Sequence, residues 1–173
     1  MVPFKRISNT VIPAALEKAL RYRLLNEPHE AESICLDVLA ADPDHAEALV
    51  MLLLALTDQF DHEYADARAR AKEVLPRLPT GYEQEYYDGI INERWAKAQL
   101  KRGVPGNVAS GWFHEAMHCY ERAMAHAVPG NPDAALRWNA CARILARYEL
   151  TKSTPENLSR DLDDGFGDEM PPR

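Results

Sequence analysis

Proline-containing breaks divide residues 13–150 into segments that are each long enough to form one helix. Within these segments apolar residues recur every three or four positions, which is the spacing of an amphipathic helix. No stretch alternates apolar and polar residues with β-branched side chains, so the chain offers no strands from which a sheet could form. Because proline ends a helix and short polar residues cap the next one, the breaks predict an all-α protein of about seven helices.

The breaks also predict where each helix lies. The expected helices cover residues 13–25, 28–41, 45–58, 61–75, 82–102, 112–127 and 133–150. The segment 103–111 contains three glycines and is expected to form a loop before the sixth helix. Residues 1–11 are expected to form an N-terminal arm, and the acidic residues 151–173, which lack apolar periodicity, a flexible tail.

Length and charge exclude several classes of protein. A chain of 173 residues fits one domain with its own core. Its formal charge of -7 disfavours binding to nucleic acid or to an anionic membrane surface, since both attract positive patches. No apolar run approaches the roughly 20 residues that span a bilayer, and residues 7–13 are too polar for a signal-peptide core. We therefore expect a cytoplasmic protein.

The first two helix pairs resemble tetratricopeptide repeats. Ala31 and Ala65 lie 34 residues apart, which is the period of that family. The residues that carry the resemblance in the two pairs are Ala15, Ala19, Tyr22, Ala31, Cys35, Val38 and Pro43, then Leu49, Leu52, Leu56, Ala65 and Ala69. Small residues at these places would let paired helices approach closely.

The resemblance implies a right-handed α-solenoid of antiparallel helix pairs over residues 12–150. Its repeats would be 12–45, 46–79 and 80–130, followed by a closing helix at 133–150. The third repeat is about 17 residues longer than the period allows. We interpret the excess as an insertion that lengthens the fifth helix and adds the 103–111 loop.

Such an array has a groove lined by the first helix of each pair, and the family commonly binds peptides there. The resemblance places eight polar residues in this groove: Arg23, Asp58, Gln84, Asp88, Asn92, Asn139, Arg143 and Arg147. We therefore expect a non-catalytic protein–protein interaction module, an adaptor or assembly factor, that binds a protein or peptide and needs no cofactor. Alternatively, Arg143 and Arg147 only solvate the end of the array or pair with Asp88.

Three positions in the N-terminal half of the groove depart from the chaperone-binding members of the family, which grip a C-terminal carboxylate. Leu16, Leu20 and Val50 stand at the matching places. This half of the groove is therefore expected to be apolar, and either the N-terminal arm or a hydrophobic partner segment would fill it.

Residues 114–118, His-Glu-Ala-Met-His, offer a different interpretation, a small zinc-dependent hydrolase. In this motif two histidines one helical turn apart bind zinc, and the glutamate activates water. However, the repeat register directs Ala116 inward and places His114 and His118 on the outer surface, and no third ligand is evident. We expect a surface pair that holds no metal.

A third alternative is a structural subunit that forms a homodimer through a helix face near Trp95 or through the ends of the array. The three tryptophans, Trp95, Trp112 and Trp138, are expected in the core. The three cysteines are odd in number and lie at or beside apolar helical positions, so we expect reduced, buried thiols.

Overall fold

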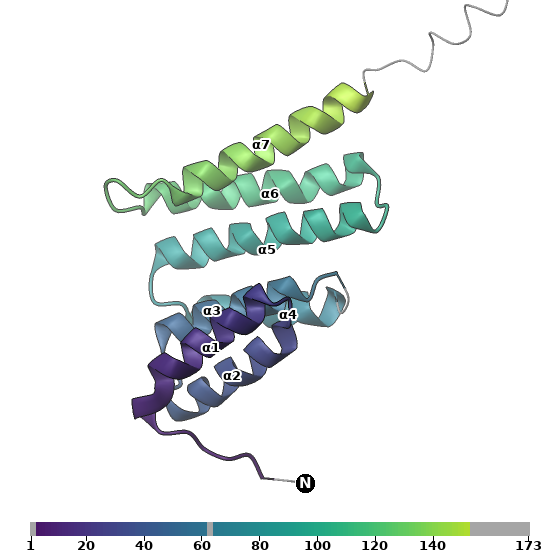
Figure 1. Ribbon diagram of the computed structural model, residues 1–173. Helices are drawn as coiled ribbons and strands as arrows, with labels where there is room; N and C mark the ends of the chain where they lie inside the picture. Colours follow the sequence, from purple (N-terminus) through teal and green to yellow (C-terminus); the bar gives the residue numbers. More distant parts are fainter. Residues whose placement is uncertain (1–2, 62–63, 153–173) are drawn as a thin grey trace, which may run out of the picture.

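In a computed structural model, which describes residues 3–61 and 64–152, the protein is all-helical, and no strand occurs in this part of the chain. The described residues form seven α-helices, which are labelled in Figure 1, and two short 3-10 helices, η1 and η2. Their bounds are η1 Asn9–Val11, α1 Ile12–Leu24, α2 Pro28–Ala41, α3 Ala46–Asp58, α4 Tyr64–Val74, η2 Leu75–Arg77, α5 Gly81–Lys101, α6 Gly106–Ala125 and α7 Asp133–Lys152. None of the described helices is long and apolar enough to cross a membrane.

The helix ends follow from local chemistry. Pro28 occupies the first turn of α2, where its missing N–H leaves no hydrogen bond unmade. The Nδ1 atom of His45 accepts a hydrogen bond from the Ala48 amide (3.3 Å) and caps α3. Thr80 caps α5 in the same way, accepting from the Glu83 amide at 3.2 Å. Pro28 and the two caps stand at the predicted breaks. The sequence therefore predicts the first residues of α2, α3 and α5 to within one residue.

Helices that follow one another in the chain pack together, and two further contacts join α1 to α3 and α3 to α5. In Figure 1, α1–α4 gather in the N-terminal half, and α5, α6 and α7 lie side by side in the C-terminal half. The closest pairing is that of α5 with α6.

Helix α5 belongs to both halves of the core. Its Ile91 and Trp95 are buried with the side chains of α1–α4, whereas its Ile90 and Ala96 are buried with those of α6 and α7. Two adjacent residues of a helix point about 100° apart, so one helix can serve two clusters. This position makes α5 the element that connects the two halves.

The register of α4 differs from the prediction. Ala69 is exposed, and the buried residues are Ala67, Ala71 and Val74. They repeat the buried pattern of α2, Ala31, Cys35 and Val38, at a spacing of 36 residues rather than 34. The reason lies in the connections: three residues join α1 to α2, whereas five join α3 to α4. The side chain of Ala65 lies outside the described residues.

The predicted glycine-rich loop at 103–111 is mostly helical. Helix α6 already begins at Gly106, and Gly103, with φ of 83°, lies in the short connection formed by residues 102–105. Gly106 lets α7 approach closely, because a Cβ atom there would lie 3.0 Å from the Tyr148 ring. The excess length of the third pair is therefore absorbed by the helices, with 21 residues in α5 and 20 in α6.

At the N-terminus the arm does not fill a groove between first helices. Ile7 packs against the N-terminal core, and Phe4 is 94% exposed beside α2, near Asp37 and Ala40. Leu20, one of the predicted apolar groove residues, is therefore left 44% exposed. At the other end α7 continues to Lys152, and the rest of the predicted tail, 153–173, lies outside the described residues.

Candidate binding face

Two of the predicted groove residues, Arg23 and Asp58, contact each other. Arg23 Nε of α1 donates to Asp58 Oδ2 at the end of α3 (2.7 Å). The second oxygen of Asp58 accepts from Arg94 of α5, which also donates to the Thr57 hydroxyl at 2.9 Å. One carboxylate thus joins α1, α3 and α5, and it is shared by two guanidinium groups.

Asp88 and Asn92 lie on another side of α5, and the structure does not bring them together with Arg23 and Asp58. Asp88 forms an ion pair with Lys72 of α4, and Asn92, only 3% exposed, accepts from Arg68 of α4 (3.3 Å). Asn92 also donates to Asp88 (3.1 Å). Both side chains therefore face α4, across α5 from Arg94, and they hold helices together.

Gln84 is also engaged in the fold rather than presented on a surface. Its Nε2 atom donates to the carbonyl oxygen of Leu78 at 2.8 Å, across the turn that precedes α5. This bond fixes the approach to α5.

The three α7 residues are exposed as predicted. Asn139, Arg143 and Arg147 are all exposed, whereas Cys141 is buried and Trp138 and Leu145 pack against the C-terminal core. The alternative in which Arg143 or Arg147 pairs with Asp88 does not occur, because Lys72 holds that carboxylate.

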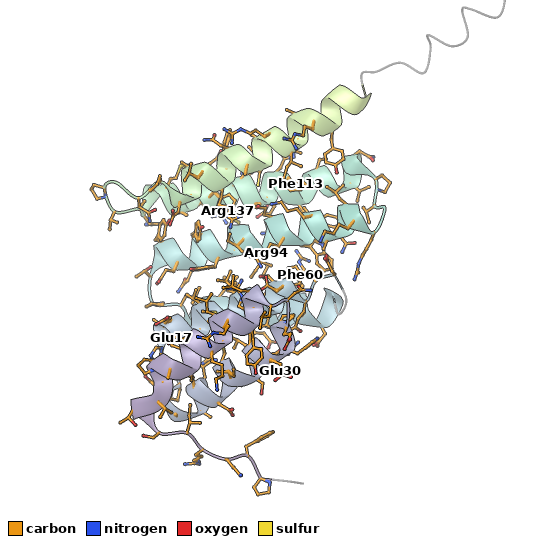
Figure 2. The ribbon with its side chains drawn as sticks, viewed as in Figure 1. Glu17, Glu30, Phe60, Arg94, Phe113 and Arg137 are labelled. Carbon is orange, nitrogen blue, oxygen red and sulfur yellow. The ribbon has the colours of Figure 1, made fainter. Side chains whose placement is uncertain are left out.

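A fully buried carboxylate, Glu93, connects α5 to α6 and α7. It accepts a hydrogen bond from the Tyr120 hydroxyl (2.6 Å), and it forms ion pairs with Lys97 and with Arg137 of α7 (3.3 Å for Arg137). Burial and the adjacent carboxylate raise the pKa of Tyr120, so its hydroxyl remains a donor. Figure 2 labels Arg94 on α5 and Arg137 on α7; the first pairs with Asp58 of α3 and the second with Glu93 of α5.

Together these contacts define a basic face that crosses three helices. Its members are Arg23 of α1, Arg94, Lys97 and Lys101 of α5, and Arg137 and Arg147 of α7. The carboxylates bonded to it are Asp58, Glu93 and Asp61, the last of which lies 2.6 Å from Lys101. Six basic side chains thus face three carboxylates, on a chain whose formal charge is -7.

The basic face contains an open pocket between the C-terminal parts of α5 and α7. We call it the α5/α7 pocket; its volume is about 610 Å³, and Lys97, Leu100, Lys101, Ile144, Arg147 and Tyr148 line it. Lys97 and Lys101 have side chains that are 41% and 70% exposed. The floor is apolar and the rim is cationic, which suits a ligand that carries both a carboxylate and an apolar side chain.

The histidine pair of the zinc motif lies outside this face. His114, Glu115 and His118 are exposed on α6, whereas Ala116 is fully buried, as the repeat register predicts. His114 Nδ1 is bonded to the carbonyl oxygen of Ser110 at 2.8 Å. Within residues 3–61 and 64–152 no group of three His, Cys, Asp or Glu side chains is arranged to hold a metal ion.

The other candidate reactive groups are structural. Cys35, Cys119 and Cys141 are free and buried, and burial raises the pKa of each thiol, to about 12, 11 and 12 respectively. A thiol held in its protonated form is a poor nucleophile. Trp95 is 9% exposed and stands edge-on to Trp112, so its ring is part of the core.

Arg94, Lys97, Lys101 and Arg137 were missing from the predicted groove. The first three recur at spacings of three and four residues in the fifth helix, so they share one helix face, and this signal was present in the sequence. Arg137 had no such signal, because its position depends on the buried Glu93 carboxylate.

Comparisons of the chain with known protein families, with curated proteins and with solved structures find no match. The resemblance to tetratricopeptide repeats therefore remains a prediction from the sequence, and the basic face must be interpreted from its own chemistry.

Proposed function

We propose that this chain is a non-catalytic interaction module that binds an acidic segment of another protein on the basic face. The helices that contribute to the face are α1, α5 and α7, with α3 supplying Asp58 between them. This is the side on which a helical repeat array would present its first helices. The contacts of α1 with α3 and of α3 with α5 support that arrangement.

The excess of positive charge is the observation that carries the proposal. Each of the carboxylates Asp58 and Glu93 is shared by two basic side chains, so donors remain for further acceptors. A carboxylate bound to Arg or Lys forms charge-assisted hydrogen bonds, which are stronger than neutral ones. Because the chain as a whole carries a formal charge of -7, an acidic partner is attracted to this face rather than to acidic parts of the surface.

Charge reversal within the face tests the proposal. The variant K101E/R147E changes two exposed side chains of the α5/α7 pocket and is expected to abolish capture of the partner by the tagged full chain. The control K18E/R21E alters the net charge equally, on the side of α1 turned away from Arg23, and is expected to retain the partner. Equal recovery by both variants would contradict the proposal.

The salt dependence of capture gives an independent readout. Screening lengths shorten from about 10 Å at 0.1 M salt to about 3 Å at 1 M, so a partner held by exposed charges is expected to elute as salt rises. A partner that stays bound in 1 M salt would be held by apolar contacts elsewhere.

No observation in the described part of the chain favours the zinc hydrolase. Metal analysis of protein purified without a histidine tag distinguishes the two functions directly. Zinc bound in a one-to-one ratio and lost in the variant H114A/H118A would revive the hydrolase hypothesis.

A further inference from the structure

The α5/α7 pocket lies close to the point where the described chain ends. Tyr148, which lines it, precedes Lys152 by one helical turn, or about 6 Å. Residues 153–173 follow directly. Any segment within the first part of this stretch is therefore tethered beside the pocket.

The sequence of that stretch complements the pocket. Its acidic residues are concentrated between Asp161 and Glu169, where Leu162 and Phe166 are interspersed among them. The pocket has the opposite charge at its rim, with Lys97, Lys101 and Arg147, and an apolar floor. The carboxylates of the segment match the cationic rim, and its Leu162 or Phe166 matches the apolar floor.

Residues 153–161, which connect α7 to the acidic segment, are long enough to let this segment reach the pocket and short enough to keep it nearby. The nine residues from Ser153 to Asp161 extend to at most roughly 30 Å, which permits the chain to turn back over α7. A linker of this length holds its ligand at an effective concentration on the order of millimolar. Even if the acidic segment binds weakly, it then fills the pocket most of the time, and no second molecule is needed.

We propose that residues 158–170 of this chain occupy the α5/α7 pocket and that an acidic partner must displace them. This inference rests on the proposed function, because it assigns a competitor to the same face. The segment thereby raises the threshold for partner binding and makes the site selective for partners that are more acidic, or better anchored, than the segment itself.

The experiment measures the anisotropy of a fluorescent peptide with the sequence of residues 156–170, titrated with the full-length protein. In the variant D161N/D163N/D164N the tethered segment loses three charges and competes poorly. We expect the peptide to bind this variant at least about fivefold more tightly than wild type, as when the tether occupies the pocket about four-fifths of the time.

Two controls isolate the effect. The variant E17Q/E30Q/E47Q removes the same charge from exposed positions of α1, α2 and α3, of which Figure 2 labels Glu17 and Glu30. It is expected to change the affinity less than about twofold, since these charges are distant and screened. Adding K101E/R147E to the neutralised tail is expected to abolish binding of the peptide.

Each other outcome overturns the inference. Equal binding by wild type and the tail variant, abolished in both by K101E/R147E, would show that the face binds acidic peptides while the segment leaves it empty. If the peptide binds neither wild type nor any variant, the inference is also overturned. The capture experiment with K101E/R147E then tests the proposed function separately. A dimer in light scattering that dissociates on tail neutralisation would assign the segment to a second copy.

Discussion

The contact between Gly89 and Tyr120 sets how closely α5 and α6 approach. A Cβ atom on Gly89 would lie 2.4 Å from the nearest carbon of the Tyr120 ring, and that ring is fully buried. The ring cannot move freely, because its hydroxyl is bonded to Glu93 at 2.6 Å. Glycine is therefore required at position 89 for space and not for backbone conformation.

Gly89→Ala is expected to lower the free energy of unfolding by about 1–3 kcal/mol, the usual effect of inserting a carbon into a packed core. Gly111 gives the matched control, since a Cβ atom there meets nothing within 4 Å. Because alanine favours a helix interior, Gly111→Ala is expected to raise stability by about 0.5–1 kcal/mol. Urea denaturation measures both, and a stabilising Gly89→Ala would refute the packing.

The buried thiols make stability depend on pH in the alkaline range. An unfolded cysteine titrates near pH 8.5, whereas burial raises the pKa of Cys35 to about 12 in the folded chain. Between these values the unfolded state has lost a proton that the folded state retains. Stability is therefore full below about pH 8 and falls as the pH rises.

Each such thiol is expected to contribute a slope of up to about 1.4 kcal/mol per pH unit in this range. Unfolding by urea at pH 8, 9 and 10, in the presence of reductant, measures the slope for wild type and for Cys35→Ala. The variant is expected to show the shallower slope. Parallel slopes would mean that Cys35 is ionised as readily in the folded chain as in the unfolded one.

At the scale of elements, the sequence predicts the number and order of helices but not every register. Pro28, His45 and Thr80 mark helix starts through local chemistry, which is why these starts were predictable. In α4 alanines occur at 65, 67, 69 and 71, so composition could not distinguish two registers. The longer connection between α3 and α4 selects the one in which Ala67 and Ala71 are buried.

A pair of leucine substitutions distinguishes the two registers. Ala71 is fully buried, so Ala71→Leu is expected to lower the free energy of unfolding by about 1–3 kcal/mol through overpacking. Ala69 is exposed on the same helix, and Ala69→Leu is expected to stay within about 0.5 kcal/mol of wild type. Thermal or urea denaturation provides the comparison, and the reverse order would restore the 34-residue register.

The start of α6 illustrates what local sequence could not reveal. Gly106 and Gly111 suggested a loop, since isolated glycine disfavours helix. In the structure, residues 106–111 are nevertheless helical, and the Tyr148 ring of α7 lies against Gly106, where a Cβ atom would be 3.0 Å from it. This contact joins residues more than 40 positions apart, so local propensity does not reveal it.

At the scale of the whole molecule, the binding face was only partly predictable. Arg23 and Asp58 are joined by an ion pair, and Asn139, Arg143 and Arg147 are exposed on α7. Asp88 and Asn92 face α4 instead, because α5 serves two cores and its polar residues are divided between two sides. Ion pairs between helices could not be predicted from the sequence. One example is Glu93, which pairs with both Lys97 of α5 and Arg137 of α7.

The central claim is that an acidic partner binds the basic face, and photo-crosslinking in cells tests it most directly. A photoreactive amino acid replaces Lys101 in the α5/α7 pocket or, as a control, the exposed Met124 of α6, which lies on no helix of the face. We predict partner adducts at position 101 that map to an acidic segment, and none at position 124. Adducts confined to position 124, or to a basic segment, would contradict the account.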